Sequence, residues 1–274
     1  ADHRLGNQDP ADSRRYAVKG EAQRHYIDID HYAHGGADPF EIVPKKWDDA
    51  VAKFTEDTLQ AYGIVPWHIQ VMYGRLVGAF KRGDVDRILR TSADLGHYVA
   101  DAHVPLHTTE NYNGQLTNQH GIHAFWESRI PELSAENYDH LVGRAQYVED
   151  PLAVAWEAVK ASNHLVGSVF SIERRLSLSY PEDQKYVFED RGRGGTRLYS
   201  REFTKAYEDA MQGMVEARMN ASILTLGNIW YSAWVDAGQP DISRYDEKDV
   251  SDSLKAVLKA EQEMWDENRK GFGR

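Results

Sequence analysis

The fold of this chain is decided by the stretch PWHIQVMYGRLVGAFKRGDVDRILRTSADLGHYVADAHVP, residues 66–105. Apolar side chains recur in it every three or four positions, which is the spacing of one helix face buried in a core. Pro66 suits the first turn of a helix, Gly83 suits the end of one, and Asp84 can cap the next. Because Pro105 disfavours helical backbone just before it, the pattern predicts two consecutive helices separated by Gly83.

The same helical spacing recurs along most of the remaining sequence. It predicts helices over residues 47–62, from 124 to 130, over 152–176 and over 200–237. The short segment 25–30 is either a strand or a helical turn, and residues 108–119 form a polar loop. Residues 1–20 lack any period and are expected to be an extended lead-in, while the glycine-rich basic run 191–197 is expected to be a flexible loop. We therefore expect an all-α fold, with packed helices in a single domain over residues 1–274.

Composition narrows the classes of function. Hydrophobic residues make up 41% of the chain and charged residues 27%, and no apolar stretch approaches the roughly 18 residues of a membrane span, so we expect a soluble globular protein without an integral membrane segment. The formal charge of -11 repels nucleic acid and anionic membranes at long range unless bound cations reverse the local sign. Since the chain has no cysteine, any metal site must use His, Asp and Glu.

Five of the twelve histidines lie between residues 97 and 123, where an even distribution would place about one. His97 and Asp101 are four residues apart on a predicted helix, so both side chains project from the same face and can bind one ion. His123 and Glu127 repeat this arrangement. His107 follows Pro105 closely, and a rigid turn there can direct its imidazole back toward the helix end.

These five side chains are suitable zinc ligands. Zinc binds neutral imidazole and carboxylate oxygen in tetrahedral sites, and a catalytic ion keeps one position open for water. Five protein ligands exceed one such site, so the set is better divided between two or more ions. Paired ions are suited to holding the attacking and leaving oxygens of a phosphoryl group.

The motifs HYVADAHVPLH at residues 97–107 and GIHAFWE at residues 121–127 resemble those of zinc-dependent phospholipase C and of the fungal zinc-dependent single-strand nucleases. Members of that superfamily also carry an upstream Asp and a His in a segment like RHYID, residues 24–28 here. The resemblance implies that the metal site lies between helices. It assigns two sets of zinc ligands, which are Asp12, His25, His97 and Asp101 for one ion, and His107, His123 and Glu127 for another.

The resemblance also implies an activity, namely hydrolysis of phosphodiesters by metal-activated water. Asp12 could serve as the general base, and Tyr26, Asp28 and Tyr32 are candidate substrate contacts because they follow His25 closely. The sequence GIHAFWE after a glutamine-containing loop is closer to the phospholipase pattern, so we expect a phospholipid substrate. The alternative is a single-strand nuclease and 3'-nucleotidase, which would use aromatic side chains for base stacking. Members of the superfamily are secreted or periplasmic, and we expect the same here.

One departure from the superfamily lies at the start of the chain. Its mature proteins begin with a Trp that helps to bind a third zinc ion, whereas the first Trp here is Trp47. We therefore expect a missing N-terminal segment, two zinc ions in the chain as given, and three in an extended chain. If the chain does begin at Ala1, His3 could substitute.

Other interpretations stay open for the whole protein and for single residues. A di-iron carboxylate bundle is disfavoured because no histidine has a Glu three residues before it. A protein in which zinc only links helices is the non-catalytic alternative. His103 and His120 match no position of the superfamily pattern and are expected to be outer-shell or surface residues. His31, His34 and Asp38 are expected in a solvated loop.

Overall fold

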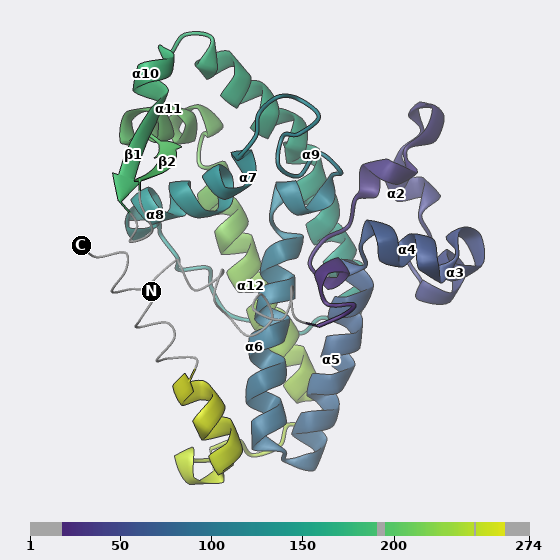
Figure 1. Ribbon diagram of the computed structural model, residues 1–274. Helices are drawn as coiled ribbons and strands as arrows, with labels where there is room; N and C mark the ends of the chain where they lie inside the picture. Colours follow the sequence, from purple (N-terminus) through teal and green to yellow (C-terminus); the bar gives the residue numbers. More distant parts are fainter. Residues whose placement is uncertain (1–17, 191–194, 244, 261–274) are drawn as a thin grey trace.

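The computed structural model describes residues 18–190, 195–243 and 245–260 (Figure 1). The described chain is mostly helical, and its one sheet has two strands, so the all-α prediction is confirmed. The predicted lead-in over residues 1–20 lies almost entirely outside the described residues. Within the described ranges, every helix is too short or too polar to cross a bilayer.

Helices α5 (Val65–Arg82) and α6 (Val85–Ala102) are the two helices predicted from the central stretch. Gly83 ends the first with a φ of 64°, a left-handed conformation that glycine adopts without steric cost. The side chain of Asp84 then accepts a hydrogen bond from the backbone N–H of Arg87 at 3.1 Å and caps the second helix. The structure therefore confirms both the helix end at Gly83 and the cap at Asp84.

Helices α9 (Pro151–Ser177) and α12 (Met214–Asp236) pack against α5 and α6, and the four run together through the centre of the molecule (Figure 1). Their inner faces form an apolar core that is closed to solvent. Core residues on these helices include Leu76, Leu95, Val99, Val159 and Ile229. Burial of such side chains is the main source of folding stability, and it fixes the end of α6, where His97 and Asp101 lie.

Two predicted helices are interrupted in the structure. The segment 47–62 forms α3 (Trp47–Phe54) and α4 (Glu56–Tyr62), which are separated at Thr55 with a φ of 70°. The Thr55 hydroxyl accepts a hydrogen bond from the backbone N–H of Thr58 and begins the second helix.

The segment 200–237 is divided in the same way. It forms α11 (Arg201–Met211) and α12, because Gln212 and Gly213 adopt φ values of 53° and 79°. The two helices therefore leave this turn in different directions, and the predicted continuous helix over 200–237 is wrong.

The segment before α3 consists of short helical turns. These are η2 (Ala22–Arg24), η3 (Ile29–Tyr32), η4 (His34–Gly36) and α2 (Pro39–Ile42). Between η2 and η3 the backbone N–H of Ile27 donates to the carbonyl of His107 at 2.9 Å, and that of Asp28 donates to the carbonyl of Tyr62 at 2.7 Å. The first bond holds the His25 segment against the turn that carries His107, and the second holds it against the end of α4.

A β-hairpin follows the short helix α10 (Glu182–Lys185). Strands β1 (Tyr186–Asp190) and β2 (Gly195–Tyr199) are antiparallel, with Phe188 opposite Arg197. The predicted flexible loop over 191–197 is therefore wrong for residues 195–197, while residues 191–194 lie outside the described residues. The guanidinium of Arg197 lies 3.6 Å from the centre of the Tyr186 ring, a contact that orders this basic residue.

The segment between α6 and α9 carries the second half of the candidate site. It contains η5 (Pro105–Thr108), α7 (Ile122–Ala124), the π-helical turn η6 (Phe125–Arg129), α8 (Ile130–Ser134) and η7 (Ala135–Asn137). Between η7 and α9 the chain is extended and lies along α12, where the N–H of Val148 donates to the Ser232 hydroxyl at 2.7 Å. After α12 come η8 (Glu247–Asp249) and helical residues 252–260.

Candidate metal centre

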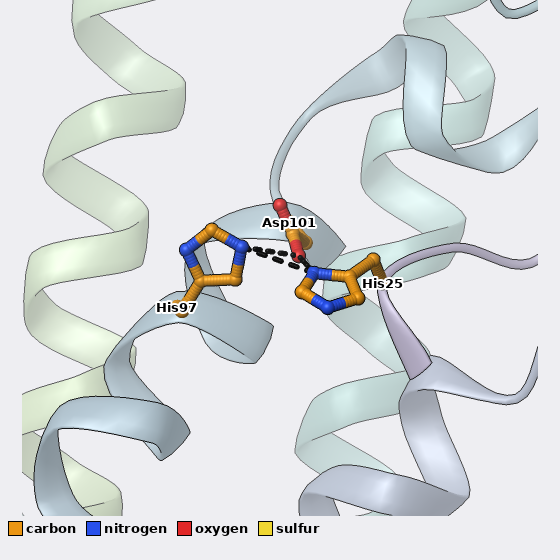
Figure 2. A group of neighbouring side chains, drawn as sticks. All are labelled: His25, His97 and Asp101. Carbon is orange, nitrogen blue, oxygen red and sulfur yellow. Dashed lines mark hydrogen bonds and ion pairs between the residues drawn. The ribbon is translucent and has the colours of Figure 1, made fainter. Parts of the chain in front are cut away.

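Three side chains converge on one point beside the end of α6, and we call them the first cluster: His25, His97 and Asp101 (Figure 2). Nδ1 of His25 lies 2.9 Å from Oδ2 of Asp101 and 3.0 Å from Nε2 of His97. Nε2 of His97 lies 3.3 Å from Oδ2 of Asp101, which completes a triangle of two nitrogens and one oxygen. The i,i+4 spacing on α6 brings His97 and Asp101 together, as the sequence predicts, and η2 delivers His25 from the other side.

The first cluster is shielded from solvent, because all three of its side chains are buried. Burial by itself raises the pKa of Asp101, but electrostatic interactions with His97 and His107 and a hydrogen bond with His25 outweigh it and hold that pKa below its ordinary value. The carboxylate is therefore negative at neutral pH. A buried anion of this kind requires a nearby cation or proton.

The second cluster consists of His107, His123 and Glu127. Nε2 of His123 lies 2.8 Å and Nε2 of His107 3.4 Å from Oε2 of Glu127. His123 and Glu127 again have i,i+4 spacing, this time across α7 and η6, and His107 approaches from η5 after Pro105. Burial alone raises the pKa of Glu127, but hydrogen bonds with His107 and His123 hold it well below its ordinary value.

Backbone carbonyls fix the tautomers of both histidines in the second cluster. Nδ1 of His107 donates to the carbonyl of His25 at 2.6 Å, and Nδ1 of His123 donates to the carbonyl of Tyr112 at 3.2 Å. In a neutral imidazole, the other nitrogen then carries a lone pair. Both Nε2 lone pairs therefore face the carboxylate of Glu127, an arrangement that is repulsive unless a cation or proton lies between them.

The spacing within both clusters fits a bound zinc ion. Ligands about 2.0–2.1 Å from a tetrahedral ion lie about 3.3 Å from one another. The three separations in the first cluster and the two to Glu127 in the second, from 2.8 to 3.4 Å, are close to that value, and all ligand atoms of each cluster lie within 4.8 Å of one another. Two imidazole nitrogens and one carboxylate oxygen per cluster are also the ligand types that zinc prefers when cysteine is absent.

The two clusters adjoin each other. Oδ2 of Asp101 belongs to the first cluster, and its Oδ1 lies 3.7 Å from Nδ1 of His107, whose Nε2 faces Glu127 in the second cluster, so the ring of His107 separates the two carboxylates. The second cluster is the more accessible, since the side chains of His123 and Glu127 are 23% and 26% exposed. A substrate would therefore reach the centre from the side of His123 and Glu127.

The other predicted site residues differ in how exposed they are and in what they contact. Asp12 lies outside the described residues. Tyr26 is partly exposed, and its hydroxyl donates to the carbonyl of Ala61 at 3.3 Å. Tyr32 is 1% exposed and packs against Phe54, a position typical of a core residue, so we assign it to the core rather than to substrate binding.

Asp28 has a strongly altered acidity. Burial, followed by the negative charges of Asp30 and Glu110, raises its pKa to about 7, and His107 partly opposes this shift. The backbone N–H of Asp28 donates to the carbonyl of Tyr62, and Asp28 follows Ile27, whose N–H donates to the carbonyl of His107. Its predicted contact with substrate stays a prediction.

Among the histidines whose side chains the structure describes, no other joins either cluster. His103 is buried, where its Nδ1 donates to the carbonyl of Val99 at 2.7 Å, and burial lowers its pKa to about 4. His120 is exposed. His31 stacks on Tyr62 with ring centres 3.3 Å apart, so it is more ordered than a residue of a solvated loop.

The predicted solvated loop also included Asp38 and His34. Asp38 is exposed, and its side chain caps α2 by accepting from the N–H of Phe40 at 2.9 Å. The side chain of His34 lies outside the described part of the structure.

Glu21 is a buried carboxylate next to the first cluster that was not predicted from the sequence. Its Oε1 lies 3.7 Å from Nε2 of His25, on the side of the ring away from His97 and Asp101. The i,i+4 spacing of Glu21 and His25 is the available sequence signal. It is a weak one, because such pairs are common by chance.

No protein-family model matches the chain, and no curated protein or solved structure matches it either. The geometry of the two clusters and the motifs that carry them are therefore the grounds for a candidate metal centre.

Proposed function

We propose that this protein is a zinc-dependent phosphodiester hydrolase that resembles phospholipase C. The observation that carries the proposal is the pair of adjoining clusters, in which each of two carboxylates faces two imidazole nitrogens. Structural zinc sites are normally single and closed by four protein ligands. Two adjoining sets of three ligands leave positions for water or substrate, as catalytic sites do.

Zinc ions bound at the two clusters would supply positive charge to the phosphoryl oxygens and lower the pKa of a water molecule. The protein's own residues orient that centre. Asp101 lies beside the ring of His107, and the carbonyls of His25 and Tyr112 fix the rings of His107 and His123. Asp12 remains the proposed general base and a proposed ligand beside His25, and Tyr26 and Asp28 remain proposed substrate contacts.

The proposed substrate is a phospholipid, by the resemblance of GIHAFWE to the phospholipase pattern. One observation favours the alternative, a single-strand nuclease. Tyr112 is 53% exposed, and its ring lies edge to face with His123, with centroids 6.1 Å apart. An exposed aromatic ring beside the accessible cluster could stack on a nucleobase. The net charge of -11 opposes an approach by nucleic acid, and we therefore keep the phospholipid as the first candidate.

The proposed zinc content is two ions, one at each cluster. The proposed location, secreted or periplasmic, comes from the resemblance alone.

The test of function is hydrolysis by the zinc-loaded protein of two substrates in parallel, phosphatidylcholine in mixed micelles and single-stranded DNA. Faster hydrolysis of phosphatidylcholine supports the proposal, and faster hydrolysis of DNA supports the nuclease. Zinc binding that stabilises the fold without hydrolysis of either substrate would contradict both and support the non-catalytic alternative. Tyr112→Ala separates the two activities further, because it should weaken DNA hydrolysis only if bases stack on this ring.

A further inference from the structure

Glu21 is a buried carboxylate that lies behind His25, relative to the first cluster. The residue is 1% exposed, and two donors hold it in place. The hydroxyl of Tyr98 on α6 donates to Oε1, and Nη1 of Arg24 donates to Oε2 at 2.6 Å. Because an isolated buried carboxylate is costly, these partners explain how Glu21 is retained inside the protein.

The imidazole of His25 lies between two acidic groups. Its Nδ1 faces His97 and Asp101, and its Nε2 faces Oε1 of Glu21 at 3.7 Å. Nε2 is fully buried and has no hydrogen-bond partner among the residues that the structure describes. The distance from Nε2 of His25 to Oε1 of Glu21 is about 0.5 Å longer than a direct hydrogen bond. A small rotation of the ring or of the carboxylate would close this gap.

A histidine can bind a metal through Nδ1 only if Nδ1 carries no proton. The ring proton must then lie on Nε2, and the buried Nε2–H requires an acceptor. Histidine ligands of metals generally donate this second N–H to a carboxylate, a carbonyl or water. In the first cluster, Glu21 is the carboxylate placed on that side of the ring.

We propose that Glu21 is a positioning residue, which accepts a hydrogen bond from Nε2–H of His25 and so keeps the Nδ1 lone pair of His25 directed at the first cluster. This inference rests on the proposed metal site. It adds a residue that does not touch the metal, and it links the site to α6 through Tyr98, which lies next to the ligand His97.

Glu21→Gln is the direct test, because it keeps the shape of the side chain and replaces one acceptor oxygen with an NH2 donor. The remaining amide oxygen cannot serve the donors on Tyr98, Arg24 and His25 equally. Loss of an outer-shell partner typically costs about 10- to 100-fold in metal affinity, and we expect a loss in this range when zinc affinity is measured by competition with a chelating dye.

A matched control is Glu208→Gln. Glu208 is a partly buried carboxylate on α11 that also accepts from a tyrosine hydroxyl, that of Tyr138, and it belongs to neither cluster. This variant should leave zinc affinity unchanged. Tyr98→Phe keeps the Glu21 carboxylate but removes its Tyr98 donor, so it should lower zinc affinity by less than Glu21→Gln does.

The second readout uses the wild-type protein and needs no variant. In zinc-loaded protein with 15N-labelled histidine, long-range 1H–15N spectra distinguish a metal-bound nitrogen from an N–H. We expect His25 to show zinc on Nδ1 and a slowly exchanging proton on Nε2. Zinc on Nε2 of His25, or unchanged affinity in folded Glu21→Gln, would overturn the inference. Failure of the wild type to bind zinc would instead contradict the proposed function.

Discussion

The carbonyl oxygen of His25 accepts a hydrogen bond from Nδ1 of His107 at 2.6 Å. The same residue therefore contributes its side chain to the first cluster and its main chain to the orientation of the second. Since the next residue but one, Ile27, donates its N–H back to the carbonyl of His107, the two segments are paired in both directions. A displacement of the His25 segment should therefore disturb both clusters together.

This coupling gives a prediction for Gly63, which adjoins the His25 segment. Gly63 has a φ of 90°, and a Cβ there would lie 2.2 Å from the carbonyl oxygen of Tyr26. Gly63→Ala should therefore destabilise the fold by about 2 kcal/mol or more in urea denaturation, and it should also weaken zinc binding. Gly74→Ala on α5 is the control, because its Cβ meets nothing within 4 Å and should stabilise the helix by roughly 0.5–1 kcal/mol. Equal free energies of unfolding for the two variants would contradict the close approach of Gly63 to the His25 segment.

The two histidines near α7 should differ sharply in importance. His123→Ala removes an Nε2 that lies 2.8 Å from Glu127, whereas His120 is exposed and belongs to neither cluster. We expect His123→Ala to lower zinc affinity by more than the roughly 100-fold cost of losing an outer-shell partner, with kcat falling in parallel. His120→Ala should leave both quantities near the wild-type values. Similar losses in the two variants, measured by zinc competition and steady-state kinetics, would show that the second cluster is assigned incorrectly.

Removal of zinc should destabilise the protein. A ligand that binds only the folded state at 100 times its Kd contributes about 2.7 kcal/mol, so a chelator should lower Tm and added zinc should restore it. Asp101→Asn removes the negative charge of the first cluster, and this variant should respond to zinc much less than the wild type. A Tm that does not depend on zinc in the wild type would argue against a zinc site in the folded protein.

The ion pair between Glu173 on α9 and Lys185 gives a prediction about pH that is separate from the metal site. Nζ of Lys185 lies 2.8 Å from Oε1 of Glu173, and the carboxylate is buried. Burial alone raises the pKa of Glu173, but hydrogen bonds with Lys185, Gln119 and Ser177 hold it below its ordinary value. The carboxylate therefore stabilises the fold above the unfolded-state pKa of about 4.5, and this contribution is lost as pH falls through the lower folded-state value.

Glu173→Gln should accordingly cost about 3 kcal/mol of unfolding free energy at pH 7 and much less near pH 3. Glu157 is an exposed residue on the same helix, and Glu157→Gln should change stability by less than about 0.5 kcal/mol at either pH. Urea denaturation of both variants at the two pH values measures these differences. A cost that does not change with pH would show that the charge of Glu173 does not stabilise the fold.

Local sequence signals predicted the central helices and the pairs within the candidate site. Gly83 and Asp84 act as a helix end and a cap through their own backbone preferences, so a single sequence reveals them. The pairs His97 with Asp101 and His123 with Glu127 lie on single turns, and their proximity follows from helix geometry.

Features that depend on contacts between distant segments were not predictable in this way. Thr55 takes a positive φ that is uncommon for residues other than glycine, so helix periodicity gave no reason to divide the segment there. The hairpin at residues 186–199 is too short for a clear strand pattern. Glu21 accepts a hydrogen bond from the hydroxyl of Tyr98, which is 77 residues away in sequence, and only the packed structure brings the two together.

The most direct measurement is a crystal structure of the zinc-loaded protein with anomalous diffraction recorded on both sides of the zinc absorption edge. The account predicts two neighbouring anomalous peaks. One should lie about 2.0–2.2 Å from Nδ1 of His25, Nε2 of His97 and Oδ2 of Asp101. The other should lie at the same distance from Nε2 of His107, Nε2 of His123 and Oε2 of Glu127. Absence of a peak at both clusters in crystals that contain zinc, or peaks only at surface residues elsewhere, would contradict the assignment of a metal centre to this protein.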